Sequence, residues 1–125
     1  MNYFKSFSKK NRLELFAFIF FSVCAVSGNT QTFENLTSIQ CDSLINANVN
    51  NPDFVILDVR TPNEYNPEHL EGAINRDYYD SDFSDQLDAL IKHKTYLIHC
   101  KSGGRSGIAF DEMQTLGFEE VYNML

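Results

Sequence analysis

Residues 96–106 constrain the fold of this chain more than any other stretch. The apolar run Tyr96-Leu97-Ile98 has the character of a β-strand and leads through His99 to Cys100. Two glycines and an arginine follow, and a helical pattern begins at Gly107-Ile108-Ala109-Phe110. The sequence therefore predicts a strand, a short loop and a helix, with a thiol where the strand meets the loop.

The loop after the cysteine has the composition of an anion-binding turn. Gly103 and Gly104 allow the backbone to curl so that successive amide groups point inward. The positive end of the helix dipole lies at the same place, and Lys101 and Arg105 add formal positive charge. We therefore expect the Cys100 thiolate to be stabilised, with a pKa below the ordinary value of about 8.5. A buried, inert cysteine at a strand end is the alternative.

Strand-like and helix-like segments alternate along the rest of the chain. Strands are predicted at residues 32–36, 54–59, 72–75, 96–100 and 121–123, and helices at 38–45, 62–66, 83–94 and 107–116. This alternation predicts an α/β fold with a mainly parallel central sheet flanked by helices. Such sheets bind ligands at the carboxyl ends of their strands. Asp58, Arg60 and Cys100 all fall at such ends.

Two of these helices carry signals at their ends. Thr61-Pro62-Asn63-Glu64 is a helix start with a capping threonine, proline in the first helical position and glutamate in the third. Lys92-His93-Lys94 suits the C-terminus of the helix that begins near Phe83.

The first 27 residues have the pattern of an export signal. Four basic residues precede an apolar run at 15–26 and small residues before Gly28: Lys5, Lys9, Lys10 and Arg12. We expect a signal peptide at 1–27, a linker and edge strand at 28–37, and a periplasmic or secreted domain at 38–125. An uncleaved membrane anchor is the alternative, although a span needs ~20 apolar residues. Lipidation at Cys24 is the third option.

The charge of the chain limits its partners. The full sequence has a formal net charge of −7, and without residues 1–27 it keeps 6 basic against 16 acidic residues, a balance of −10. A surface this acidic argues against binding of nucleic acid or anionic lipid. Membrane contact is expected only if the N-terminal segment stays attached.

Two cysteines, Cys41 and Cys100, would remain after cleavage. In an oxidising compartment they could pair, or one could be catalytic and the other incidental. A bridge depends on the Cα separation, which the sequence does not fix. We expect no bridge, because Cys41 falls within a predicted helix.

Four segments in order resemble the rhodanese-like (sulfurtransferase) domain family, from about Ser38 to the C-terminus. They are Leu57-Asp58-Val59-Arg60 with Glu64-Tyr65, the run His69 to Asn75, the run Cys100 to Ser106, and Gly117-Phe118 with Val121-Tyr122-Asn123. Glu68 stands where the family has glycine, and Arg76-Asp77 replace its Ile-Pro. The family continues past the last strand with a Gly-Gly turn and another helix, so the domain is expected to be truncated at its C-terminus.

The resemblance implies transfer of a sulfane sulfur. Cys100 would attack a small anionic donor, thiosulfate or a persulfide, and form a persulfide that a thiol or cyanide then accepts. The substrate-binding loop would be Lys101, Ser102, Gly103, Gly104, Arg105 and Ser106. No metal and no cofactor is implied.

Structural support of the site is expected from Asp58, Arg60 and Glu64. We predict that Asp58 binds loop amides and that Arg60 pairs with Glu64; direct contact of Arg60 with the substrate is the alternative. Arg105 is expected to add to the positive field or to hold the loop in place, and Ser106 to cap the following helix.

Two alternatives to an active sulfurtransferase remain. Cysteine phosphatases and arsenate reductases of similar fold have five residues between cysteine and arginine, whereas four separate Cys100 from Arg105. This tighter loop suits a sulfur atom better than a phosphoryl group. The second alternative is a persulfide carrier or binding module that serves an exported partner.

Overall fold

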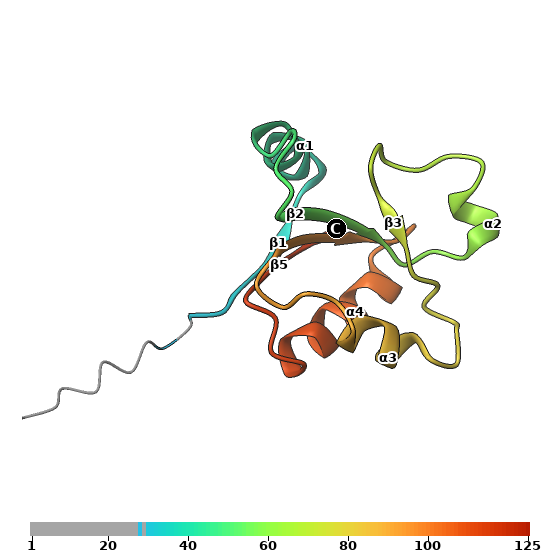
Figure 1. Cartoon of the computed structure of the whole chain (residues 1–125). Coiled ribbons are helices and arrows are strands. Elements are labelled where there is room, and N and C mark those ends of the chain that lie inside the picture. Colours follow the sequence, from blue (N-terminus) through green and yellow to red (C-terminus); the bar gives the residue numbers. More distant parts are fainter. Residues whose placement is uncertain (1–27, 29) are drawn as a thin grey trace, which may run out of the picture.

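The computed structural model describes residues 28 and 30–125 (Figure 1). Over this part of the chain it has five strands and four helices: β1 (Thr32–Leu36), α1 (Ser38–Ala47), β2 (Phe54–Asp58), α2 (Pro62–Tyr65), β3 (Ile74–Asn75), α3 (Phe83–Asp88), β4 (Thr95–His99), α4 (Gly104–Thr115) and β5 (Glu120–Met124). The predicted signal segment at 1–27 lies outside the described residues. None of the helices described is long and apolar enough to cross a membrane.

The strands form one sheet in the order β1-β5-β4-β2-β3, and every pair between described strands is parallel. This confirms the predicted α/β fold with a mainly parallel sheet. β4 lies at the centre, and its His99 is in register with Asp58 of β2. The sheet therefore brings the loop after β4, which begins at Cys100, next to the loop after β2, which begins at Val59.

Helices cover the two faces of the sheet unequally. Figure 1 shows α1 on one face and α3 with α4 on the other. The larger core lies under α3 and α4 and includes Leu57, Val59, Phe83, Leu87, Tyr96, Ile98, Ala109, Met113, Phe118 and Val121. A smaller cluster under α1 contains Leu36, Cys41 and Leu97. The strand and helix that flank Cys100 are thus fixed by the main core.

Local signals set the starts of the helices. Thr61 caps α2 through a capping box with Glu64, as the sequence predicts, and Thr37 caps α1 in the same way with Gln40. α4 begins at Gly104, three residues before the expected start. The expectation that Ser106 caps this helix is wrong, because the earlier start places Ser106 inside α4 and makes Gly103 the capping residue.

One predicted helix is too long. We expected a helix from Phe83 to Lys94, but α3 ends at Asp88. The Lys92 ammonium donates to the Asp88 carbonyl oxygen (2.7 Å), and the Tyr96 hydroxyl donates to the carbonyl of Ile91 (2.9 Å). These contacts satisfy carbonyls that a longer helix would have bonded internally. Lys92 therefore still interacts with the helix C-terminus, from outside the helix.

Candidate active site

Cys100 lies directly after β4, at the start of a short loop that leads into α4. Gly103 has φ +82°, a left-handed conformation that favours glycine. Its amide donates a hydrogen bond to Cys100 Sγ over 3.2 Å. The strand, loop and helix predicted from residues 96–106 are present, and the loop turns at least one backbone donor toward the sulfur.

The surroundings of Cys100 favour its thiolate. Burial raises the pKa, but hydrogen bonds from the hydroxyl and amide of Ser106 and from the amides of Ser102 and Gly103 outweigh burial and lower the pKa to about 7. About half of the thiol is therefore ionised at neutral pH. The side chain of Cys100 is half-buried, so small molecules can reach it.

Arg105 is held by Glu64 of α2. Its two terminal nitrogens donate to the two carboxylate oxygens over 2.7 and 2.8 Å, which is a bidentate ion pair. The Arg105 hydrogen bonds, supported by the Thr61 cap, hold the pKa of Glu64 well below its usual range. The pair ties the loop after β4 to the helix that follows β2.

The predicted pairing of Arg60 with Glu64 is wrong. Arg60 Nη2 lies 2.6 Å from Asp58 Oδ2, and Nε donates to both Asp58 oxygens (3.0 and 2.9 Å). The Asp58 side chain is fully buried and also accepts from the Arg60 amide (2.9 Å). Asp58 takes Arg60 because a buried carboxylate needs an adjacent charge partner. Glu64 is left for Arg105.

The residues on either side of Cys100, His99 and Lys101, differ in their surroundings. His99 is buried, with Nε2 3.5 Å from Asp58 Oδ2, and burial lowers its pKa although the Asp58 charge opposes this. Lys101 is exposed and has no ion-pair partner among the described residues. Lys101 therefore carries a positive charge that is free to attract an anion.

Two hollows flank the loop, and Lys101 lines both. The smaller, about 350 Å³, is lined by Arg60, Glu68, His69, Leu70, His99, Cys100, Lys101 and Met124. The larger, about 610 Å³, is lined by Glu64, Tyr78, Tyr79, Lys101, Ser102, Gly104, Arg105 and Ile108. Tyr78, Tyr79 and Ile108 are not among the site residues predicted from the sequence. The only signal for the two tyrosines is their place in an acidic loop, residues 77–81.

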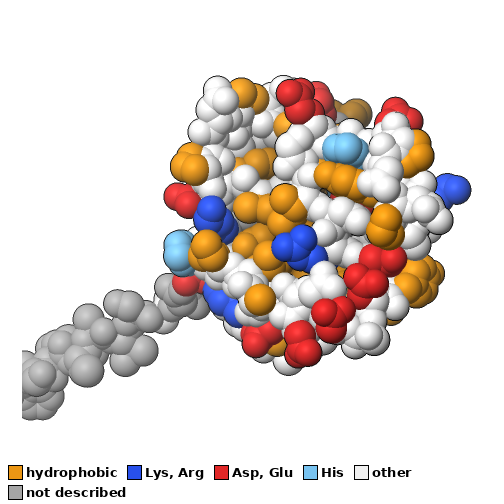
Figure 2. Space-filling model, turned by 45° about the vertical axis from the view of Figure 1, so that its right-hand side comes forward, with side chains coloured by type: hydrophobic (Ala, Val, Ile, Leu, Met, Phe, Trp, Pro, Cys, Tyr) orange, Lys and Arg blue, Asp and Glu red, His pale blue; other side chains and the backbone are white. Residues whose placement is uncertain are grey.

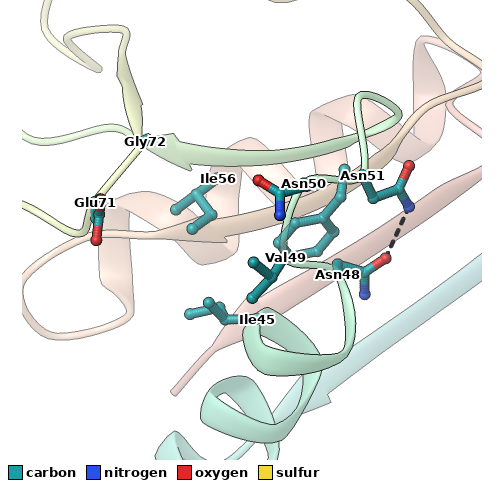
Figure 3. A pocket seen from close by; sticks show the side chains of 9 residues that line it. Ile45, Asn48, Val49, Asn50, Asn51, Ile56, Glu71 and Gly72 are labelled. Carbon is teal, nitrogen blue, oxygen red and sulfur yellow. Dashed lines mark hydrogen bonds between the residues drawn. The ribbon is translucent and has the colours of Figure 1, made fainter.

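A third hollow, of about 360 Å³, lies between the end of α1 and the start of β2 (Figure 3). Ile45, Val49 and Ile56 line it, and Asn51 Nδ2 donates to Asn48 Oδ1 at its edge (2.8 Å). Its lining, as far as the chain is described, has no cysteine, histidine, lysine or arginine. We therefore place the candidate site at the Cys100 loop.

The two described cysteines are free thiols in different environments. Cys41 is a fully buried residue of α1, and this burial raises its pKa although a backbone hydrogen bond opposes it. No group of three histidine, cysteine, aspartate or glutamate side chains in the described residues could hold a metal ion.

Alkylation should separate these thiols. In the folded full chain we expect iodoacetamide to modify Cys100 about 100-fold faster than Cys41, since of these two thiols only Cys100 is accessible and has a lowered pKa. The rate at Cys100 should rise with pH, with a midpoint near 7. Ser106→Ala should move that midpoint upward. Mass spectrometry of the digested protein measures each site separately; a midpoint above 8 for the unaltered chain would contradict the stabilised thiolate.

Fold and site together define a class: an α/β protein with an activated cysteine between the central strand and a helix N-terminus. A family model of the rhodanese-like domain matches residues 42–125. The chain belongs to the rhodanese-like domain family.

Two thiosulfate sulfurtransferases are similar to the chain in sequence. The chain is 30% identical over 69 residues to thiosulfate sulfurtransferase PspE of Escherichia coli (54% of this chain, 64% of the relative). It is 31% identical over 74 residues to thiosulfate sulfurtransferase GlpE of Coxiella burnetii (58% of this chain, 66% of the relative). It thus spans just under two thirds of the length of these relatives.

Two solved structures are similar to the chain over most of its described part. One is SSP1007 of Staphylococcus saprophyticus, with a TM-score of 0.61, 26% identity and coverage of 74% of this chain and 86% of the other. The second is the rhodanese-like domain of the Alr3790 protein of Anabaena, with a TM-score of 0.52, 26% identity and coverage of 66% and 82%. The first match shows the same fold, and the second agrees with the assignment to the rhodanese-like domain family.

Proposed function

We propose that this protein is a sulfurtransferase that moves a sulfane sulfur from an anionic donor, such as thiosulfate, to a thiol or to cyanide. The observation that carries the proposal is the Cys100 thiol, whose pKa is lowered to about 7 by hydrogen bonds within its own loop. An ionised thiol needs no general base to act as a nucleophile. The named relatives are thiosulfate sulfurtransferases, which supports this choice of chemistry.

The transfer takes two displacements at sulfur. The Cys100 thiolate attacks the outer sulfur of thiosulfate, the sulfur–sulfur bond of the donor breaks, and sulfite leaves with the bonding electrons. An acceptor thiolate or cyanide then attacks the outer sulfur of the Cys100 persulfide, and Cys100 leaves as a thiolate. Electrons balance without a metal or a redox cofactor.

The residues of the Cys100 loop and of its surroundings have different roles in this transfer. The amides from Lys101 to Ser106 stabilise the anionic persulfide, and Lys101 draws the anionic donor into the smaller hollow. Arg105 positions the loop through Glu64. Asp58 and Arg60 support the neighbouring loop, which begins at Val59.

A persulfide carrier is the second candidate, since an intact cysteine permits loading without turnover. A cysteine phosphatase or arsenate reductase has less support, because the loop between Cys100 and Arg105 is one residue short for that chemistry. We also propose export to the periplasm or the exterior, on the basic and apolar pattern before Gly28.

Intact mass measurement tests the proposal on the reduced full chain. We expect thiosulfate to add one sulfur atom and cyanide to remove it, with thiocyanate released. Loading should rise with pH around 7, as the Cys100 thiolate forms. Repeated turnover with cyanide indicates an enzyme, and loading without turnover indicates a carrier. A folded, reduced protein that gains no sulfur would exclude thiosulfate as the donor.

A further inference from the structure

The larger hollow meets the loop and the start of α4 through Lys101, Ser102, Gly104 and Arg105, whereas Cys100 lines the smaller hollow, where we place thiosulfate. The volume of the larger hollow, about 610 Å³, falls in the range of pockets that hold drug-sized ligands, ~300–1,000 Å³, and is far larger than a small inorganic anion needs. This space suits a bulkier reactant than the donor.

Exposed apolar groups stand at the rim of this hollow. Tyr79 is 68% exposed and Ile108 is 56% exposed. Large apolar side chains exposed together beside a reactive group are typical of a contact surface, and tyrosine is enriched where proteins bind one another. Tyr79 also packs over the Arg105 guanidinium, with 5.7 Å from the carbon to the ring centroid. The rim is thereby joined to the loop that holds Cys100.

The charge around the hollow selects the partner. Arg105 is neutralised by Glu64, so Lys101 is the one free cation among the described residues that line it. The two tyrosines are flanked by three acids, Asp77, Asp80 and Asp82. The side chains of these acids accept hydrogen bonds from neutral groups such as the Gln86 amide. None of the three forms an ion pair in the described part of the chain. Figure 2 shows an arc of acidic side chains along one margin of the molecule. The segment that carries the two lining tyrosines is therefore negative beside the hollow.

We propose that the larger hollow is the docking site of the sulfur acceptor, and that this acceptor is a protein cysteine flanked by basic and apolar residues. This inference rests on the proposed function and names its second substrate. The acceptor segment covers Tyr79 and Ile108, its basic groups face Asp80 and Asp82, and its thiolate attacks the outer sulfur of the Cys100 persulfide. The sulfur–sulfur bond to Cys100 breaks, and Cys100 leaves as a thiolate.

Two synthetic peptides test the charge preference. Each carries one cysteine beside a tyrosine, and they differ only in two lysines or two glutamates next to the cysteine. The full chain is loaded with thiosulfate, checked by mass, freed of donor and mixed with each peptide. We expect Asp80→Asn with Asp82→Asn to lower the ratio of the basic-peptide rate to the acidic-peptide rate about fivefold at low salt, and about 0.5 M salt to remove the difference.

Because the same two peptides are used with every protein variant, a change in the rate ratio between variants does not depend on the intrinsic reactivity of the peptides. Asp42→Asn with Glu34→Gln, two exposed acids on α1 and β1, is the matched charge control and should leave the ratio unchanged. Tyr79→Ala should slow transfer to the basic peptide about tenfold relative to transfer to cyanide, which is too small to contact the rim. If the rate ratio changes equally in the two double variants, the proposed docking site is wrong. It is also wrong if Tyr79→Ala slows transfer to the basic peptide and transfer to cyanide by the same factor. Absence of loading overturns the proposed function itself.

Discussion

Replacement of Cys100 by serine is expected to abolish sulfur loading. After treatment with thiosulfate the intact mass of the variant should not change, which corresponds to a loss of more than about 10³-fold in rate. Serine keeps the size of the side chain and the donors of the loop, but its hydroxyl is not ionised at neutral pH. The persulfide also requires sulfur at this position, so no residual route through residue 100 remains.

Cys41→Ser is the matched control, because Cys41 is the other cysteine of the described residues. Its thiol is fully buried and has a raised pKa, so we expect this variant to load one sulfur atom at the rate of the unaltered chain. Mass spectrometry of the digested proteins locates the added sulfur. Loading that persists in Cys100→Ser would place the reactive thiol elsewhere and remove the basis of the proposed mechanism.

Strands and helix starts that depend on neighbouring residues could be predicted from the sequence. The apolar run before Cys100 predicts β4, and the capping sequence at Thr61 predicts the start of α2. Both depend on residues that are close along the chain. The alternation of such segments predicts the α/β fold and places Cys100 at a strand end, because parallel sheets impose that arrangement.

The ion pairs could not be assigned in this way. Two acids and two arginines lie around the site, and several pairings satisfy local spacing. Glu64 and Arg105 are 41 residues apart along the chain; they meet only because β2 and β4 are neighbours in the sheet. Tyr79 was missed for the same reason, since only the folded loop brings it to Arg105. The end of α3 depends on the Tyr96 contact, which periodicity does not show.

The two ion pairs that flank the loops differ in their surroundings. Glu64 and Arg105 keep 30% and 17% exposure, whereas the Asp58 side chain has 0% and Arg60 has 18%. Water can solvate Glu64 if Arg105 is removed, whereas loss of Asp58 leaves Arg60 with the Glu68 carbonyl oxygen and limited contact with water. Asp58 also faces His99, at 3.5 Å, on the central strand. We therefore assign the larger stabilising effect to Asp58 and the positioning of the loop to Glu64.

Asp58→Ala is accordingly expected to lower the free energy of unfolding by about 3 kcal/mol, at the lower end for breakage of a buried ion pair because Arg60 keeps some contact with water. Urea unfolding of the full chain at pH 7, followed by circular dichroism, measures this difference. Asp88→Ala is the control: Asp88 pairs with Lys92 but is 63% exposed, so its loss should cost less than about 1 kcal/mol. Equal losses in the two variants would show that Arg60 finds another partner, such as the Glu68 carbonyl oxygen that it already contacts at 2.9 Å. Asp58 would then be dispensable for stability.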